Sequence, residues 1–344
     1  MKVNKSIFPI EWSLSDPLVV PYHGKKVFGT FVCGGGSTMG YKLAGFNHLG
    51  GVEFTPHYSK VYRANHKPMY FYEEDIRLFN KRNDLPAELY DLDLLDGSPP
   101  CAAFSTVGAR EKLWGKVSEY EGQKQVKDDL VFVYCDTIEK LMPKTFLLEN
   151  VSGLIKGNAR SYFNRIVARL SQKYDVQAFL LYAASMGIPQ IRNRVFIVGK
   201  RKDFSAVKKL HLEFDCPQIG FDVTRKYWAI PIDKNTDISS YSIGRLWDEF
   251  SAGGHPKRFS LKKPYLNKPC FTITESDSSV ATAGVCHPTI KRKLNVEEVK
   301  TLCTFPRDYN FLDINPVSVM GRSVLPVMMA NISNQIYTQW LSKM

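Results

Sequence analysis

The chain has 344 residues, 44% of them hydrophobic, which is typical of a globular protein with its own core. This length exceeds that of most single domains, so the sequence predicts a large domain and a smaller one. A formal net charge of +12 favours a polyanionic partner, and the lack of an apolar run of about 18 residues argues against a membrane span.

Seven cysteines are scattered along the chain without a Cys-x-x-Cys pair. This pattern argues against both a disulfide framework and a structural zinc site. The N-terminal stretch is interrupted by Glu11 and Asp16, so it does not resemble a secretory leader. We therefore expect a cytoplasmic monomer that needs no metal ion and has no contact with a membrane.

The predicted elements alternate up to about residue 200. Apolar and β-branched runs predict strands at 27–32, 51–54, 92–95, 145–148, 176–181 and 195–198. Helix-like stretches at 129–142 and 159–173 lie between them. This alternation predicts an α/β fold with a doubly wound, mostly parallel sheet. From residue 201 onward the composition is typical of a smaller, loop-rich domain, and a helical pattern returns only at 295–303 and 324–341.

A glycine-rich segment, 31–40, follows the first predicted strand. Glycines there allow a sharp turn and the close approach of a ligand, as in nucleotide-binding turns between a strand and a helix. Glu53 ends the second strand, where a carboxylate can bind both ribose hydroxyls, and Phe54 could stack on adenine. Asp75 could accept a hydrogen bond from the adenine amino group. Together these positions favour a ligand that contains adenosine.

A second set of side chains lies at the ends of later strands. Cys101 comes just past the third predicted strand, behind two prolines that restrict the backbone, and in an open α/β sheet this position faces the ligand cleft. Glu149 ends the next strand, at the same edge of the sheet. Arg192 and Arg194 precede the last strand, and alternation along an extended chain points both to one side together with Gln190.

These residue types suit one reaction at a pyrimidine base. Carbon 5 of cytosine is a poor nucleophile, and addition of the Cys101 thiolate to carbon 6 would activate it. A protonated Glu149 could donate to ring nitrogen 3, and an arginine could stabilise negative charge at the carbonyl of carbon 2. A base inside a duplex is out of reach, so it would have to be flipped out first.

Six motifs in this order resemble those of the bacterial DNA (cytosine-5) methyltransferases, from about residue 26 to 340. The matching segments are 31–40, Pro100-Cys101, Glu149-Asn150-Val151, 190–194, 292–306 and 321–324. The resemblance implies a Rossmann-like, S-adenosylmethionine-dependent methyltransferase domain formed by 1–200 and 312–344. It also implies a smaller target-recognition domain, which would occupy 201–311 and include the ninth motif of the family.

The resemblance further implies which residues act and on what. Catalytic roles fall on Cys101, Glu149, Arg192 and Arg194. Contacts with the cofactor S-adenosyl-L-methionine fall on Phe31, Gly34, Gly35, Gly36, Glu53, Phe54, Asp75, Ile76, Ser98, Pro100 and Ser323. The implied substrate is a flipped cytosine in a specific double-stranded DNA sequence of the bacterial nucleoid, and the implied by-product is S-adenosyl-L-homocysteine. The enzyme would act beside a separate cognate restriction endonuclease or as an orphan methylase.

Five positions depart from the family pattern. Gly29 stands where an aspartate is common, and Asn295 replaces a common threonine. Cys33 stands where the first glycine of the cofactor motif is usual, and Ala102 replaces the frequent glutamine after the catalytic cysteine. Arg322 occupies the usual asparagine position of the tenth motif. None of these changes removes a catalytic group, so they bear on how the cofactor is held rather than on the type of reaction.

Two related activities remain open. The segment 98–100 resembles the Ser-Pro-Pro-aromatic signature of cytosine-N4 DNA methyltransferases, although Cys101 stands where the aromatic residue would clamp the base. The segment 270–272 is similar to a short motif of tRNA cytosine-5 methyltransferases, but the residues that follow it are not. A nicotinamide-dependent oxidoreductase, or a nucleic-acid-binding protein without activity, would leave Cys101 and Glu149 unexplained.

Overall fold

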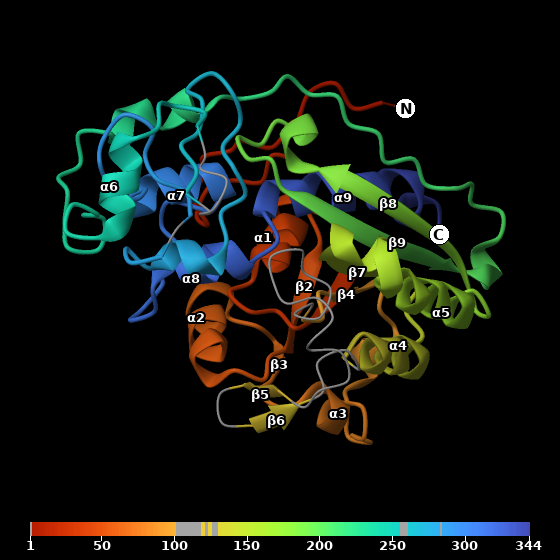
Figure 1. Cartoon of the computed structure of the whole chain (residues 1–344). Helices are drawn as coiled ribbons and strands as arrows, with labels where there is room; N and C mark the ends of the chain where they lie inside the picture. The colour runs from red at the N-terminus through yellow and green to blue at the C-terminus, as the bar shows by residue number, and fades with distance from the viewer. Residues whose placement is uncertain (1, 101–117, 121–122, 126–129, 255–260, 283) are drawn as a thin grey trace.

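A seven-stranded sheet forms the centre of the molecule (Figure 1). The computed structural model describes residues 2–100, 118–120, 123–125, 130–254, 261–282 and 284–344. The strands are ordered β3-β2-β1-β4-β7-β9-β8, with the bounds β1 Lys26–Thr30, β2 Asn47–Val52, β3 Tyr70–Tyr72, β4 Leu94–Gly97, β7 Thr145–Val151, β8 Tyr174–Tyr182 and β9 Asn193–Arg201. Within this described sheet only β9 runs antiparallel to its neighbours, so the prediction of a mostly parallel sheet is confirmed.

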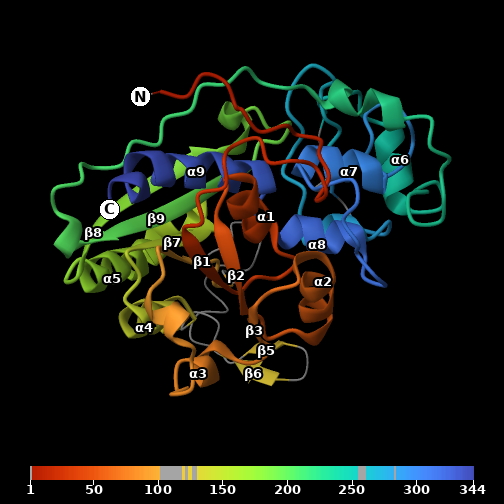
Figure 2. The same cartoon turned by 180° about the vertical axis from the view of Figure 1, so that it is seen from behind.

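Helices cover both faces of the sheet (Figures 1 and 2). On one face pack α1 (Gly36–Leu43), α2 (Pro56–His66) and α9 (Pro326–Gln339), and on the other α3 (Ile76–Phe79), α4 (Leu130–Leu141) and α5 (Arg160–Leu170). A separate two-stranded sheet pairs β5 (Ser118–Tyr120) with β6 (Gln123–Gln125). Helices on both faces of a parallel sheet define the doubly wound α/β fold that the sequence predicts. Among the described helices, none combines the length and the apolar character that a membrane span needs.

The strands are apolar on both faces because helices cover both. On β4, Leu94 belongs to the hydrophobic cluster beneath α1 and α9, whereas Leu95 belongs to the cluster beneath α4 and α5. On β7, Leu147 and Leu148 divide between the two clusters in the same way. The near-continuous apolar runs of the sequence therefore follow from the central position of these strands.

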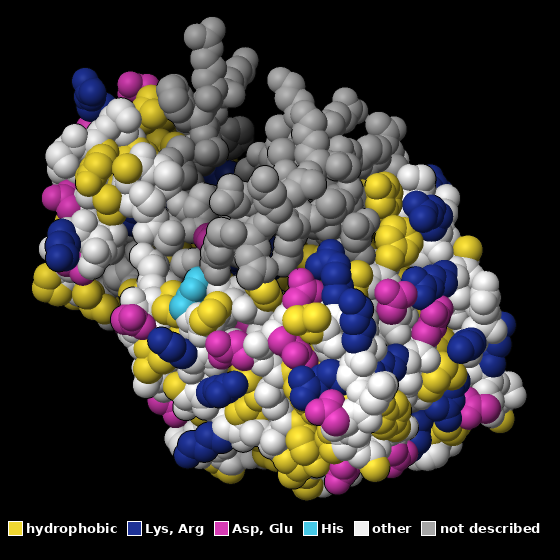
Figure 3. All heavy atoms as spheres, turned by 90° about the horizontal axis from the view of Figure 1, so that it is seen from below, with side chains coloured by type: hydrophobic (Ala, Val, Ile, Leu, Met, Phe, Trp, Pro, Cys, Tyr) yellow, Lys and Arg dark blue, Asp and Glu magenta, His cyan; other side chains and the backbone are white. Residues whose placement is uncertain are grey.

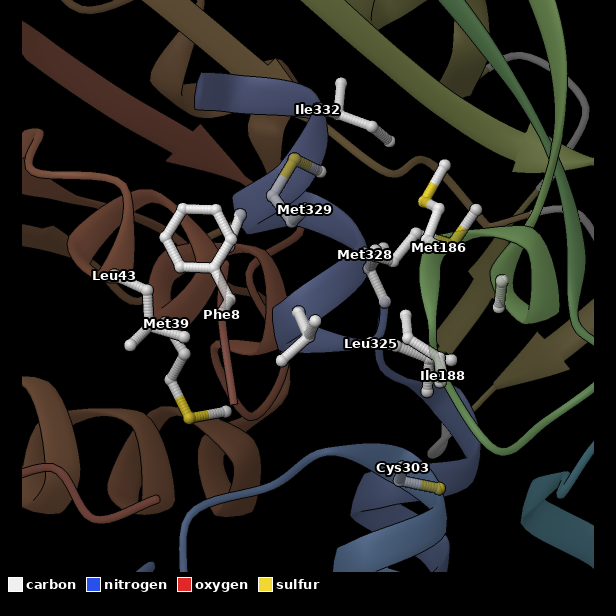
Figure 4. Close-up of a cluster of buried hydrophobic side chains, with 14 of the residues drawn as sticks. Phe8, Met39, Leu43, Met186, Ile188, Cys303, Leu325, Met328, Met329 and Ile332 are labelled. Carbon is white, nitrogen blue, oxygen red and sulfur yellow. The ribbon is translucent and has the colours of Figure 1, made fainter. Parts of the chain in front are cut away.

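Helix α9 lies in the middle of the larger cluster. Figure 4 shows Phe8 and Leu43 on one side of this helix and Met186 and Ile188 on the other. The helix begins at Pro326, a suitable first residue because the first turn of a helix needs no N–H donor there. The C-terminal helix expected from the sequence therefore packs against the sheet formed by the first 200 residues.

Beyond β9 the chain crosses the molecule to build a smaller region around α6 (Ser242–Asp248), at the opposite end from β8 (Figures 1 and 2). This region has a small hydrophobic cluster of its own. The next helices, α7 (Val296–Cys303) and α8 (Pro316–Arg322), contribute side chains to the larger cluster that contains α9. The division of the chain into two domains, with 201–311 as the smaller one, stays a prediction.

The second strand differs from its prediction. The apolar pattern predicts 51–54, but β2 begins at Asn47 and ends at Val52. Gly50 has a φ of +140°, and a Cβ there would lie 1.7 Å from the carbonyl oxygen of Tyr70 on β3. The close approach of β3 therefore demands a glycine, which removes an apolar side chain from the pattern. Because β2 ends at Val52, Glu53 is the first residue after the strand and not its last residue.

Candidate active site

A cavity of about 490 Å³ opens at the carboxyl ends of β1, β2, β4 and β7. The strand order reverses between β1 and β4, the point at which open α/β sheets bind ligands. The residues expected to contact the cofactor that line this cavity are Phe31, Gly36, Glu53, Phe54, Asp75, Ile76, Ser98, Pro100 and Ser323. Glu149, Arg192 and Arg194 line it as well, whereas Cys101 lies outside the described residues.

The glycine turn between β1 and α1 packs tightly against distant parts of the chain. A Cβ on Gly35, which has a φ of +78°, would lie 2.1 Å from Nε2 of His66. A Cβ on Gly36 would lie 2.2 Å from the carbonyl oxygen of Val324. These contacts leave no room for a side chain, so neighbours within the protein require the glycines, in addition to the ligand approach that the sequence suggests.

Glu53 is buried in the cavity wall, with 8% of its surface exposed. Its carboxylate accepts hydrogen bonds from the backbone N–H groups of Cys33 at 2.8 Å and Thr55 at 2.9 Å. Burial raises the pKa of this carboxyl, and the backbone hydrogen bonds act in the opposite direction. Each carboxylate oxygen accepts one of these two bonds.

Other polar groups of the wall differ in how they are bonded. Asp75 caps α3 by accepting from the backbone N–H of Arg77 at 2.8 Å, and it also pairs with the Arg77 guanidinium at 3.1 Å. The hydroxyl of Ser323 donates to the carbonyl of Val319 at 2.8 Å. The hydroxyl of Ser98 is buried and has no hydrogen-bond partner in the described part of the chain. A buried hydroxyl of this kind is expected to have a partner, which a ligand could supply.

Glu149 and Arg194 form an ion pair in the cavity wall. Strands β7 and β9 are antiparallel with Val151 opposite Arg194, so Glu149, two residues before Val151, shares a face with Arg194. Nε of Arg194 lies 2.9 Å from Oε1 of Glu149. Only 16% and 11% of the two side chains are exposed, so water screens this pair weakly.

The other two side chains of the Gln-x-Arg-x-Arg segment have different partners. The guanidinium of Arg192 donates to the carbonyls of Ile273 at 3.0 Å and Gly321 at 3.2 Å. The amide of Gln190 donates to the carbonyl of Leu302 on α7 at 3.1 Å. The structure therefore brings both arginines to the cavity, whereas Gln190 connects the start of β9 to α7.

The residues of the wall to which the sequence analysis assigned no role include Asn150 and Asp96. Nδ2 of Asn150 donates to the carbonyl of Pro99 at 3.3 Å and so connects β7 to the segment that leads to Cys101. Asp96 is only 3% exposed and accepts a hydrogen bond from the hydroxyl of Tyr41 at 3.1 Å. Burial is the main cause that raises the pKa of Asp96 to about 7. The sequence did contain a signal for Asp96, since an acidic residue within an apolar strand is rarely buried without a partner.

Arg322, the departure from the family pattern in the tenth motif, has partners in this protein. Its guanidinium pairs with Glu275, which begins the short 3-10 helix Glu275–Ser278. It also lies over the ring of Tyr58, 5.4 Å from the centroid. All three residues line the cavity, so Arg322 connects the end of α8 to α2 and to the loop-rich region.

Charges of both signs share the surface around this edge of the molecule. On the face shown in Figure 3, lysine and arginine side chains lie among aspartates and glutamates. The segment between Glu249 and Glu275 contains lysine and arginine but no acidic residue. Within it, Lys263 is buried and donates to the carbonyl of Trp247 at 3.2 Å. Lys268 is exposed and lies 4.7 Å from the ring centroid of Tyr265. The described residues contain no group of three His, Cys, Asp or Glu side chains that could hold a metal ion.

Sequence comparison covers nearly the whole chain. The model of the C-5 cytosine-specific DNA methylase family matches residues 26–338. The Type II methyltransferase M.NgoPII of Neisseria gonorrhoeae is 30% identical over 353 residues, covering 90% of this chain and 94% of that protein. The Type II methyltransferase M.Sau96I of Staphylococcus aureus is 26% identical over 314 residues, covering 83% of this chain and 69% of that protein.

Solved structures share the fold. A structure described as a DNA modification methyltransferase encoded within a prophage (E. coli) has a TM-score of 0.70 at 19% identity, covering 92% of this chain and 99% of that one. A mutant of Spodoptera frugiperda DNMT2 has a TM-score of 0.68 at 16% identity, covering 91% and 100%. Because the family model matches most of its length, the chain belongs to the C-5 cytosine-specific DNA methylase family.

Proposed function

We propose that this DNA (cytosine-5) methyltransferase uses Cys101 as its nucleophile and Glu149 with Arg194 to activate a cytosine flipped out of duplex DNA. The observation that supports this proposal is the buried ion pair between Glu149 and Arg194 in the wall of a cavity at the switch point of the sheet. The segment that leads to Cys101 borders the same cavity through Pro99 and Pro100.

The residues of the cavity fit S-adenosylmethionine, which supplies an electrophilic methyl group when it is bound. The cavity volume lies within the roughly 300–1,000 Å³ of typical ligand sites. Glu53 offers two buried carboxylate oxygens to the ribose hydroxyls, and Phe31 and Phe54 offer ring faces to the adenine. The unpartnered Ser98 hydroxyl offers a further hydrogen bond. The same proposal assigns Asp75, Ile76, Pro100, Ser323 and the glycine turn Gly34, Gly35 and Gly36 to this ligand.

The proposed reaction begins with the thiolate of Cys101. A bond from its sulfur to carbon 6 pushes electrons into the pyrimidine ring, where Glu149 in its protonated form delivers a proton to nitrogen 3 and Arg194 stabilises charge at the carbonyl of carbon 2. Carbon 5 then attacks the methyl group, whose former bond to sulfur breaks with the electron pair left on that sulfur. The proton on carbon 5 leaves to water, and the electrons it leaves behind expel the Cys101 thiolate. The proton on nitrogen 3 returns to Glu149, which leaves neutral 5-methylcytosine.

Arg192 has a different part in this proposal. Its buried guanidinium is bonded to the carbonyls of Ile273 and Gly321, which come from the loop-rich region and from α8. Arg192 therefore acts as a positioning residue that holds these two segments beside the cavity. Arg194, two residues further along the chain, pairs with Glu149.

Duplex DNA is the proposed partner of the surface between 201 and 311. The net charge of +12 favours a polyanion, and Lys268 with Tyr265 offers an exposed cation beside an exposed aromatic ring in this stretch. The named relatives M.NgoPII and M.Sau96I are Type II methyltransferases, which supports a role in restriction-modification with a separate endonuclease. We further propose that the protein acts as a monomer in the bacterial cytoplasm, bound to the nucleoid.

A covalent trap tests the proposed mechanism. A duplex that contains 5-fluorocytosine cannot release a proton from carbon 5, so the enzyme should remain bonded to it when S-adenosylmethionine is present, and a stable complex should appear on a denaturing gel. Mass analysis of methylated DNA should give 5-methylcytosine, and N4-methylcytosine would contradict the proposal. Methylation of tRNA in preference to duplex DNA would overturn the choice of substrate. Bisulfite sequencing of a methylated host genome would report product and target sequence together.

A further inference from the structure

Six carboxyl groups of the described residues line the cavity, and five of them have partners of their own. The groups paired with arginines are Glu74 with Arg82, Asp75 with Arg77, Glu149 with Arg194 and Glu275 with Arg322. Glu53 accepts hydrogen bonds from two backbone N–H groups. Asp96 is the sixth, and it has no cationic partner among the residues that the structure describes. The proposed mechanism gives this residue no role.

The sheet fixes the direction of the Asp96 side chain. On β4, Asp96 is in register with Leu147 of the parallel strand β7, so the side chains of these two residues point to the same face. Glu149 lies two residues after Leu147 and therefore points to that face too. Asp96 is thus the next cavity carboxyl group after the pair of Glu149 and Arg194, one strand closer to the glycine turn.

The surroundings of Asp96 are poor for an isolated negative charge. Only 3% of Asp96 is exposed, and the hydrogen bonds that reach it come from the neutral hydroxyls of Tyr41 and Ser37. Burial is the first cause of its raised pKa, and the neighbouring charge of Glu149 is a further one. A buried carboxylate is stable when a cation pairs with it, and attraction between opposite charges is strong where water is excluded.

We propose that Asp96 recognises the positive sulfonium charge of the methyl donor, so that the cavity binds the cationic donor more tightly than the neutral thioether left after transfer. This inference rests on the proposed binding of S-adenosylmethionine in this cavity. Methyl transfer leaves the electron pair of the broken bond on sulfur, which removes the positive charge. Asp96 then loses its partner, and the product is released more easily.

Calorimetric titration of the whole protein without DNA tests the inference by binding alone. The Kd values of S-adenosylmethionine and S-adenosylhomocysteine are measured for the wild type and for Asp96→Asn, which keeps the size of the side chain and an acceptor for Tyr41. We expect the variant to bind S-adenosylmethionine about tenfold more weakly, the order of one lost charge interaction, and S-adenosylhomocysteine within twofold of the wild type. Sinefungin, which carries an ammonium group near that position, should follow S-adenosylmethionine. Asp96→Ser is a second neutral variant, which guards against misfolding of Asp96→Asn. It should give the same change in the ratio of the Kd of S-adenosylmethionine to the Kd of S-adenosylhomocysteine.

The matched control is Glu74→Gln. It also removes one negative charge from the cavity wall, but from a carboxylate that is already paired with Arg82. We expect the ratio of the two Kd values to stay as in the wild type. If Glu74→Gln changed the ratio of the two Kd values as much as the Asp96 variants do, the inference would be overturned, since the change would be a general effect of charge. An equal weakening of both ligands in the Asp96 variants would overturn it too, because both ligands share the adenosine and the amino acid. If the wild type bound neither ligand, the proposed cofactor site itself would be wrong.

Discussion

Nε of Arg194 lies 2.9 Å from Oε1 of Glu149, across the antiparallel pair of β9 and β7 at the carboxyl edge of the sheet. The two residues are 45 positions apart in the sequence, and the reversed direction of β9 brings them together. Each side chain neutralises the other in a largely buried site. A cytosine that entered the cavity would meet a carboxyl and a guanidinium already fixed in position, which is the preorganisation that charge stabilisation in a reaction requires.

Replacement of Cys101 by serine tests the nucleophile. We expect Cys101→Ser to lower turnover by more than about 10³-fold, because a hydroxyl is a far weaker nucleophile than a thiolate at neutral pH. Binding to duplex DNA and the melting temperature should stay close to those of the wild type. The measurements are tritiated methyl transfer, a gel-shift titration and a thermal melt. Cys216→Ser, which changes a cysteine that does not line the cavity, is the control and should retain full turnover.

Glu149→Gln tests the proton donor. A glutamine keeps the shape of the side chain but cannot deliver a proton to nitrogen 3, so we expect turnover to fall by about 10²- to 10⁴-fold, the usual range for general acid catalysis. The matched control is Glu139→Gln, which breaks a similar pair with Arg169 away from the cavity. It should retain turnover and lose at most about 1 kcal/mol of stability. Equal turnover in the two variants would contradict the role of Glu149.

Replacement of Arg192 should lower the stability of the protein, whereas replacement of Arg194 should lower kcat. Arg192→Lys removes the buried hydrogen bonds to Ile273 and Gly321, and we expect the free energy of unfolding to fall by about 3 kcal/mol, the upper range for a hydrogen bond from a charged group. Arg194→Lys should leave the melting temperature nearly unchanged and lower kcat by about 10²-fold, the usual effect of losing one stabilising donor. Urea unfolding and steady-state kinetics on both variants check this. If Arg192→Lys lowered kcat without any loss of stability, its role would be catalytic instead.

His66 should make stability depend on pH. It lies beneath the glycine turn, and burial lowers its pKa to about 3. In the unfolded chain its pKa is about 6.5, so the unfolded state takes up the proton first and stability is lost as pH falls from about 6.5 to 3. His66→Gln removes this effect. Between pH 6 and pH 4 the unfolding free energy of the wild type should fall more steeply than that of the variant, by up to about 1.4 kcal/mol per pH unit. Parallel curves from urea unfolding would contradict this expectation.

The pair of Arg292 and Glu298 should be essential to the fold. Both side chains are buried, and the guanidinium donates to both carboxylate oxygens at 2.8 and 2.7 Å. Glu298→Ala leaves the arginine buried without its anion, so we expect a loss of about 3–5 kcal/mol in the free energy of unfolding. Asp248→Ala breaks the exposed pair with Lys291 and should cost no more than about 1 kcal/mol. Similar losses in the two variants, measured by urea unfolding, would show that burial does not govern these pairs.

The order of elements and the identity of the family follow from the sequence alone. Apolar runs of strand length alternate with helical periodicity, and this local pattern is set by the faces that each element buries, so it predicts a mostly parallel sheet with helices on both sides. The motifs around Cys101, Glu149 and Arg194 stand in an order that few other proteins share. Their residue types favour the activation of a pyrimidine ring.

Tertiary structure decided which partner each of these side chains has. Alternation along the chain predicts the same side for Gln190, Arg192 and Arg194. In the folded protein each has a different partner, because the strand order and the C-terminal segment bring different groups to each. The same holds for Asp96, whose sequence neighbours are apolar and whose isolation in the cavity depends on four strands that are far apart in sequence. Secondary structure arises from interactions between near neighbours, whereas the partner of a buried charge is set by long-range packing, which no local pattern encodes.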